Sequence, residues 1–185
     1  MRIMVIGTGA IGSLYGGWLL SGGAHVAFVA RGARHDQIRD HGIVLTGPSG
    51  ETTHRKVIVV RDPRDLPPAD VLLVAVKTYD LESAARDAIG AVSTGGLVVG
   101  VQNGVGAAAM LGASFDPEQV MVGPVYSAAK LGPGGTVRLS GQRNDVVIGN
   151  MQGTPHPAAE LLVAFWRKAG VTASISDDIQ AALWT

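Results

Sequence analysis

The chain has 185 residues, and its 15 basic and 15 acidic side chains leave no formal net charge at pH 7. That length is enough for a buried core in one domain or slightly more. The balanced charge and the low aromatic content argue against partners recognised by bulk electrostatics or base stacking. We therefore expect no nucleic acid and no membrane surface as a partner, and the absence of cysteine excludes disulfides and thiolate chemistry.

Residues 1–31 hold the most informative pattern. An apolar run at residues 2–6 predicts a strand that leads directly into a G-x-G-x-x-G motif and then a helical stretch. In this setting the motif predicts a dinucleotide-binding turn: its glycines permit a tight turn, backbone approach to a pyrophosphate and close helix–strand packing. Free N–H groups at the helix start supply an anion site. The residues of this turn are Gly7, Thr8, Gly9, Ala10, Ile11 and Gly12.

Arg31 follows the second predicted strand and favours NADP over NAD. An acidic residue near this place bonds the ribose 2′-hydroxyl of NAD, whereas an arginine accommodates the 2′-phosphate of NADP. Arg34 is a candidate second cation. The alternative interpretation is that Arg31 is a solvated residue at a strand end.

Alternating strand-like and helical segments predict the fold. Strands are expected at residues 2–6, 25–30, 56–60, 71–76, 97–101 and 120–125, and helices at 10–21, 81–89 and 105–111. Several of these strands are apolar at consecutive positions, as are strands buried on both faces of a parallel sheet. The order predicts a Rossmann-type α/β fold with a doubly wound, mainly parallel sheet and helices on both sides.

The remaining segments extend this pattern. Glycine and proline within residues 41–55 predict an extended excursion or hairpin with a short strand at 43–45. Strands near 126–130 and 136–139, a glycine-rich turn at 132–135 and a strand at 145–148 predict an antiparallel extension of the sheet. A helix over 157–169, a strand at 172–175 and a final helix capped by Ser176 or Asp177 complete the chain.

Two short motifs follow predicted strands, at the edge where open α/β sheets bind ligands. In Val76-Lys77-Thr78-Tyr79, the lysine is a candidate contact for cofactor phosphate or ribose, or else a strand-end lysine extending to solvent. In Gln102-Asn103-Gly104, the asparagine offers a donor and an acceptor to nicotinamide or substrate, or else serves an Asn-Gly turn.

The other chemistry-bearing residues are expected to be structural. The five histidines lack metal-ligand spacing, so we expect no metal site. Tyr15 and Trp18, three apart on the first helix, are expected in the core, and so is Trp184. No signal-like or membrane-spanning segment is apparent, which favours a cytoplasmic protein.

Together these residues resemble the ketopantoate reductase (2-dehydropantoate 2-reductase) family. The resemblance covers essentially the whole chain, as the N-terminal domain of that family. It rests on the glycine turn, Arg31, Val76-Lys77-Thr78, the segment 102–106, the glycine-rich hairpin near 132–135 with Ile148-Gly149 after it, and the ending 178–184.

The resemblance implies NADPH-dependent reduction of 2-dehydropantoate, a small 2-oxo acid, to pantoate on the route to coenzyme A. It implies that the glycine turn holds the pyrophosphate and that Arg31 and Lys77 meet the adenosine 2′-phosphate. It also implies that Asn103 contacts both cofactor and substrate. The backbone of Ala129 would lie against the nicotinamide.

The chain departs from the family at its end. There the last helix continues as Trp-x-Lys and the lysine is the proton donor, whereas this chain stops at Trp184-Thr185, so the lysine is expected just after Thr185. Residues 1–175 are expected to form the dinucleotide-binding domain, and 176–185 the start of the helix leading to an absent C-terminal helical domain that binds substrate.

We therefore expect the chain to bind NADP(H) and to turn over little, because general acid catalysis and substrate positioning are missing. A homodimer is left open. Two alternatives are a standalone NADP(H)-binding or sensor module, and a related dehydrogenase acting on another 2-oxo acid or an opine-like substrate.

Overall fold

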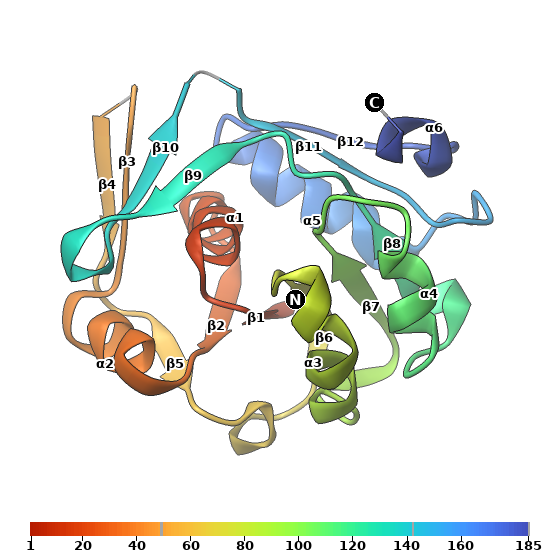
Figure 1. Ribbon diagram of the computed structural model, residues 1–185, viewed down its shortest axis with the longest axis horizontal. Coiled ribbons are helices and arrows are strands. Elements are labelled where there is room, and N and C mark those ends of the chain that lie inside the picture. Colours follow the sequence, from red (N-terminus) through yellow and green to blue (C-terminus); the bar gives the residue numbers. More distant parts are fainter. Residues whose placement is uncertain (49, 142, 185) are drawn as a thin grey trace.

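A six-stranded parallel sheet forms the centre of the molecule in the computed structural model, which describes residues 1–48, 50–141 and 143–184. Its strand order is β5-β2-β1-β6-β7-β8 (Figure 1). The consecutive apolar runs become strands buried on both faces, which confirms the predicted α/β class. The strands are β1 (Arg2–Ile6), β2 (His25–Val29), β5 (Ile58–Val60), β6 (Ala69–Val74), β7 (Val92–Gly100) and β8 (Val120–Val122).

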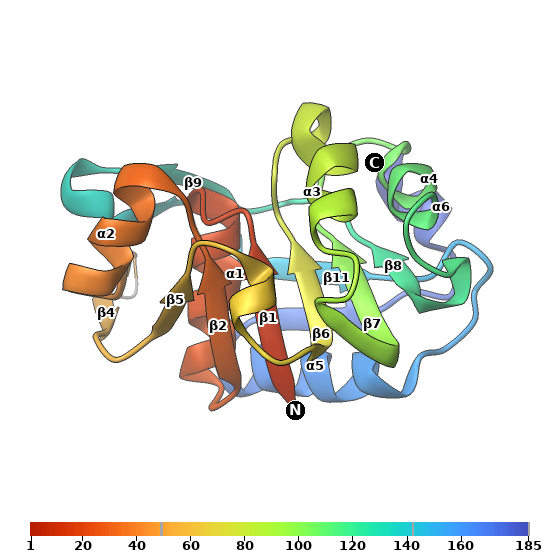
Figure 2. The ribbon, with the colours of Figure 1, turned by 90° about the horizontal axis from the view of Figure 1, so that it is seen from below.

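Helices cover both faces of this sheet (Figure 2). Alternate residues of β1 enter different cores: Ile3 and Val5 pack with one pair of helices, and Met4 and Ile6 with the other. The first pair is α1 (Ala10–Ser21) and α5 (Pro157–Lys168), and the second is α3 (Leu81–Asp87) and α4 (Ala107–Gly112). The helix predicted from residue 105 begins two residues later, after the turn in which Gly104 has φ +102°.

A second, mixed sheet packs beside α1 in the order β4-β3-β10-β9. The hairpin predicted over residues 126–139 is antiparallel and consists of β9 and β10. Because β10 also pairs in parallel with β3, this hairpin belongs to the mixed sheet and not to the main sheet. Gly17 of α1 allows β3 to pack closely against this helix, because a Cβ at residue 17 would lie 2.7 Å from the Leu45 side chain. The strands are β3 (Ile43–Gly47), β4 (Gly50–His54), β9 (Ala128–Leu131) and β10 (Val137–Ser140).

The next segment lies antiparallel to the edge of the main sheet but forms a two-stranded sheet of its own. Isolated antiparallel bridges join Val122, the last residue of β8, to Gly149, and Val125 to Val146 of β11 (Asp145–Ile148). β11 also pairs in parallel with β12 (Thr172–Ile175). The chain then reaches α6 (Ile179–Leu183), whose N-cap is Asp178 rather than the expected Ser176 or Asp177.

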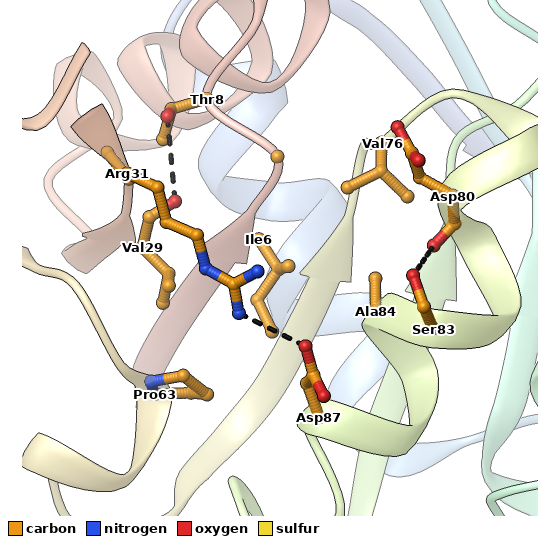
Figure 3. Close-up of a pocket in the computed structure, with 12 residues that line it drawn as sticks. Ile6, Thr8, Val29, Arg31, Pro63, Val76, Asp80, Ser83, Ala84 and Asp87 are labelled. Atoms are coloured by element: carbon orange, nitrogen blue, oxygen red, sulfur yellow. Dashed lines mark hydrogen bonds and ion pairs between the residues drawn. The ribbon is translucent and has the colours of Figure 1, made fainter. Parts of the chain in front are cut away.

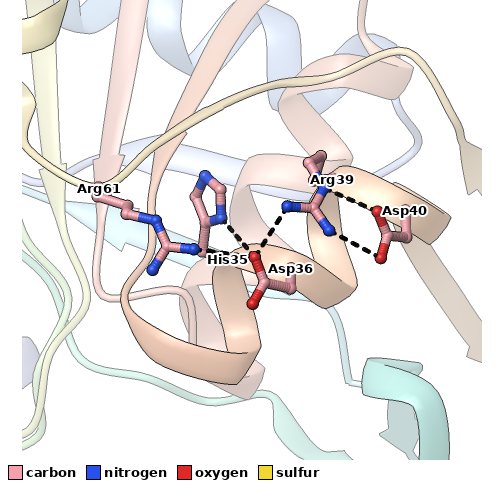
Figure 4. A network of polar contacts seen from close by, with 5 residues as sticks. All are labelled: His35, Asp36, Arg39, Asp40 and Arg61. Carbon is pink, nitrogen blue, oxygen red and sulfur yellow. Dashed lines mark hydrogen bonds and ion pairs between the residues drawn. The ribbon is translucent and has the colours of Figure 1, made fainter.

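Sequence reasoning missed helix α2 (Gly32–His41). Its only buried residue is Ile38, so it has no apolar stripe to reveal it. Polar contacts around Asp36 connect helix α2 to Arg61, which directly follows β5 (Figure 4). The Asp36 carboxylate is 3.1 Å from His35, 2.9 Å from Arg61 and 3.1 Å from Arg39. The His35 contact and then the two arginines lower the pKa of Asp36.

The expectation that Trp184 lies in the core is wrong. Its side chain is 78% exposed, because α6 is one short turn that buries Ile179 and leaves its far end in solvent. Tyr15 and Trp18 pack as expected, with their rings stacked at 5.3 Å and Tyr15 fully buried. Among the helices of the described residues, none is long and apolar enough to cross a membrane.

Because the Tyr15 hydroxyl is buried, we expect the free energy of unfolding to fall at alkaline pH. Burial raises its pKa to about 12, and the Ser127 hydroxyl offsets part of that rise, although neither hydroxyl makes a hydrogen bond of good geometry among the described residues. Because the unfolded chain releases this proton near pH 10, stability is full below pH 10. It should then fall by roughly 2–3 kcal/mol as pH rises to 12. Urea unfolding at pH 8 to 12 measures this, and Tyr15→Phe should show a correspondingly smaller loss; equal losses in both chains contradict the prediction.

Candidate functional site

The glycine turn packs backbone against backbone at the carboxyl ends of β1 and β6. Gly7 has φ +91°, and a Cβ there would meet the Val76 nitrogen and the Ala75 carbonyl carbon. A Cβ at Gly12 would overlap the carbonyl oxygen of Gly7. These two glycines are therefore required by the fold of the turn itself.

Gly9 is different, because nothing in the protein requires it to be glycine. Its φ of −68° and ψ of −164° suit any residue, and a Cβ there would meet no atom within 4 Å. Gly9 is also the N-cap of α1, where no side chain caps the helix and no acidic residue lies in the first turn. Open space in front of uncapped N–H groups fits the pyrophosphate of a dinucleotide.

Arg34 supports this turn from behind. Its Nε donates to the Thr8 carbonyl at 2.9 Å, its Nη2 to the Ser13 hydroxyl at 2.8 Å, and its Nη1 to the Gly135 carbonyl at 2.8 Å. Arg34 lines neither of the two cavities described below, so its role as a second cation for the cofactor stays a prediction. Its donors connect α1, α2 and the mixed sheet, and sequence spacing alone gave no sign of these partners.

Replacing Arg34 by alanine should lower the free energy of unfolding by about 1–3 kcal/mol, because three acceptors lose a charged donor. It should also weaken NADPH binding by loosening the turn. The matched control is Arg39→Ala on the same helix: Arg39 is exposed and, among the described residues, pairs with Asp36 and Asp40, so no measurable change is expected. Urea unfolding compares the two, and equal losses would contradict the support role.

Arg31 reaches across a cavity of about 330 Å³ (Figure 3). It is the N-cap of α2, and its Nη2 lies 3.1 Å from the Asp87 carboxylate at the end of α3. Both side chains are more than half exposed. This Arg31 cavity is also lined by Gly7, Thr8, Val76, Asp80 and Ser83.

A second cavity, of about 840 Å³, continues from the same turn. We call it the Asn103 cavity; Gly7, Val76 and Asp80 line both cavities. Among the residues singled out from the sequence, it is lined by Gly7, Gly9, Ala10, Ile11, Lys77, Asn103 and Ala129. The structure thus brings the expected site residues together around the glycine turn, with Gly12 inside it and Ala129 contributed by β9 of the mixed sheet. Lys77 lines the Asn103 cavity and does not line the Arg31 cavity.

The Asn103 side chain has both a structural contact and a free donor. Its Oδ1 accepts from the Val125 N–H at 2.8 Å, while its Nδ2 has no partner among the described residues. Gly104 follows with φ +102°, so the Asn-Gly turn expected as the alternative is also present. The turn positions the amide at the cavity wall, and the two interpretations are compatible.

Sequence reasoning missed the role of Gln102. Its side chain is buried, and Nε2 donates to the carbonyls of Val74 at 2.7 Å and Val76 at 3.2 Å. The amide thereby joins the end of β7 to the end of β6, on which Gly7 rests. A polar residue directly after an apolar strand is the signal that could have suggested it. In the described part of the chain, no cluster of His, Asp and Glu side chains is arranged for a metal ion.

The fold defines a Rossmann-type α/β protein in which the glycine turn faces two open, adjoining cavities. The family model described as ketopantoate reductase PanE/ApbA matches residues 3–153. The chain belongs to this family.

Three similar proteins show the extent of the match. The chain is 33% identical to a 2-dehydropantoate 2-reductase of Halobacterium salinarum over its full length, but spans 60% of that relative. The crystal structure of a PanE/ApbA family ketopantoate reductase from Ralstonia eutropha is 34% identical with a TM-score of 0.87, covering all of this chain and 59% of that one. D-mandelate dehydrogenase with NADH and anilino(oxo)acetate is 25% identical with a TM-score of 0.87, again over all of this chain and 59% of the other.

Proposed function

We propose that the chain is the NADP(H)-binding portion of a reductase that converts 2-dehydropantoate to pantoate in the synthesis of pantothenate and coenzyme A. The observation that carries the proposal is the meeting of the glycine turn, Arg31, Lys77 and Asn103 around two adjoining cavities. A dinucleotide that spans both cavities would have its adenosine at Arg31 and its nicotinamide at Asn103. When bound, the cofactor supplies a hydride for the substrate carbonyl.

Each expected site residue then has one task. The N–H groups after Gly9, at the start of α1, bind the pyrophosphate, and Arg31 binds the adenosine 2′-phosphate. Lys77, placed in the Asn103 cavity, is assigned to the cofactor as a point charge. Asn103 orients nicotinamide and substrate with its free Nδ2, and the backbone of Ala129 borders the nicotinamide.

The charge of the Asn103 cavity suits a 2-oxo acid. Lys77 and Lys130 line it against one carboxylate, Asp80, and neither lysine has an ion pair among the described residues. A positive excess in a cleft attracts an anionic substrate. We assign proton donation to a lysine beyond Thr185 and most substrate contacts to a C-terminal helical domain, since the chain spans about 60% of its relatives. The expected cytoplasmic location and the homodimer stay predictions.

A second candidate is favoured by the likeness to D-mandelate dehydrogenase, whose solved complex holds NADH. In that case the complete protein would reduce another 2-oxo acid, with NADH or NADPH. We assign the choice of acid mostly to side chains outside this sequence.

Oxidation of NADPH separates the candidates when it is followed in protein isolated from its natural source. Faster turnover with 2-dehydropantoate than with the 2-oxo acid that is reduced to mandelate supports the first proposal. The reverse preference supports the second. An intact mass equal to that of this 185-residue chain, together with no turnover of either acid, would instead support a standalone NADP(H)-binding or sensor module. The isolated chain should bind NADPH with little turnover. Rapid substrate-dependent oxidation of NADPH by this chain would contradict the assignment of proton donation to a lysine beyond Thr185.

A further inference from the structure

The Arg31 cavity contains a charge pair whose position bears on cofactor choice. Arg31 extends from the end of β2, and Asp87 meets it from α3 on the other side of the cavity (Figure 3). Their Nη2 and Oδ2 atoms are 3.1 Å apart, and the side chains are 72% and 54% exposed. Among the described residues that line this cavity, Arg31 is the one cation.

The stability of the fold does not explain why an acidic residue is present at position 87. An ion pair this exposed contributes little to folding, because solvent screens it and two side chains must be ordered. Asp87 is also the last residue of α3, where the helix dipole disfavours a carboxylate. Among the described residues, Arg31 is the one that forms a hydrogen-bonded ion pair with its carboxylate, and Arg64 interacts with it only through its charge.

The other arginines described near the Arg31 cavity are already engaged, and Lys77 lines the adjoining Asn103 cavity instead. The guanidinium of Arg34 is committed to Thr8, Ser13 and Gly135. Arg64 is paired with Asp62. A 2′-phosphate arriving in the Arg31 cavity must therefore compete with Asp87 for Arg31 and is repelled by the same carboxylate. The ribose of NAD has a hydroxyl there instead, which donates to a carboxylate and needs no cation.

We propose that Asp87 is a specificity-determining residue that holds Arg31 in the cofactor-free state and lowers the preference of the chain for NADPH over NADH. This inference rests on the proposed cofactor-binding function. It assigns the acidic residue of the adenosine end to α3, rather than to the end of β2 where dinucleotide-binding folds usually carry it.

The test measures the dissociation constants of NADPH and NADH for the purified chain and for Asp87→Asn, by titration of nicotinamide fluorescence. The ratio of the NADH constant to the NADPH constant should rise about threefold to tenfold in the variant, mainly through tighter NADPH binding. Asp87→Ser, which also removes the charge, should show the same rise if the asparagine variant fails to fold.

Glu82→Gln is the matched control. It removes the same charge from the same helix, but Glu82 pairs with Arg86 and does not line the cavity, so its ratio should stay as in the unmodified chain. An unchanged ratio in both Asp87 variants, or an equal rise in Glu82→Gln, overturns the role of Asp87. If the unmodified, folded chain binds neither nucleotide, the proposed function fails and this inference fails with it.

Discussion

Replacing Trp166 by alanine is expected to lower the free energy of unfolding by about 3–5 kcal/mol. Trp166 lies on α5 and is fully buried. Its indole N–H donates to the Tyr15 carbonyl at 3.2 Å, and its ring contacts the Tyr15 ring edge-on at 5.9 Å. The substitution removes the largest fully buried side chain and separates α5 from α1, the helix that begins at the glycine turn.

Two variants of α5 make this prediction specific. Leu161→Ala changes a residue that is 57% exposed and should cost less than about 0.5 kcal/mol. Trp166→Phe keeps an aromatic ring but loses the N–H donor, so its loss should fall between the two. Urea unfolding at pH 7 gives all three values. Similar losses for Trp166→Ala and Leu161→Ala would mean that α5 is not packed on α1 as described.

The second large effect is expected at the glycine turn, where two alanine substitutions should have opposite consequences. Gly12→Ala brings its Cβ onto the carbonyl oxygen of Gly7, which is backbone and cannot move aside, so stability should fall by about 1–3 kcal/mol. Gly9→Ala places its Cβ in open space at an allowed φ, so stability should stay within about 1 kcal/mol. That same Cβ would occupy the space assigned to the pyrophosphate, and NADPH affinity should fall at least tenfold, about 1.4 kcal/mol.

Unfolding in urea and titration with NADPH, carried out on both variants, separate the two roles. Gly12→Ala should lose stability and, with it, affinity. Gly9→Ala should lose affinity alone. If Gly9→Ala binds NADPH as tightly as the unmodified chain, the open space before α1 is not the pyrophosphate site.

The parallel core was predictable because its strands carry their own signal. β1 and β6 are apolar at consecutive positions, and the glycine turn has a fixed place between strand and helix. The positions of Arg31, Lys77 and Asn103 at one sheet edge followed from the rule that parallel strands end together. The order of strands and helices along the chain determines the topology of the sheet. The topology in turn places the carboxyl ends of the strands at one common edge.

What sequence reasoning missed depends on contacts between distant residues. Helix α2 is polar nearly all round and is held by charges such as Asp36, so no periodicity could reveal it. Arg34 binds Gly135, 101 positions later, and Arg31 meets Asp87, 56 positions later. The parallel pairing of β10 with β3 also joins segments between which four strands of the main sheet, β5, β6, β7 and β8, lie in the chain. No local pattern encodes such partners, although each changes the expected chemistry of the site.

Binding of NADPH to the purified 185-residue chain decides whether the glycine turn and its two cavities hold a dinucleotide. Calorimetric titration should give saturable binding at one site per chain, with a dissociation constant below about 1 mM, and at least tenfold weaker binding to Gly9→Ala. No binding of NADPH or NADH at millimolar concentration, by a chain whose circular dichroism and cooperative unfolding show it to be folded, would contradict the account.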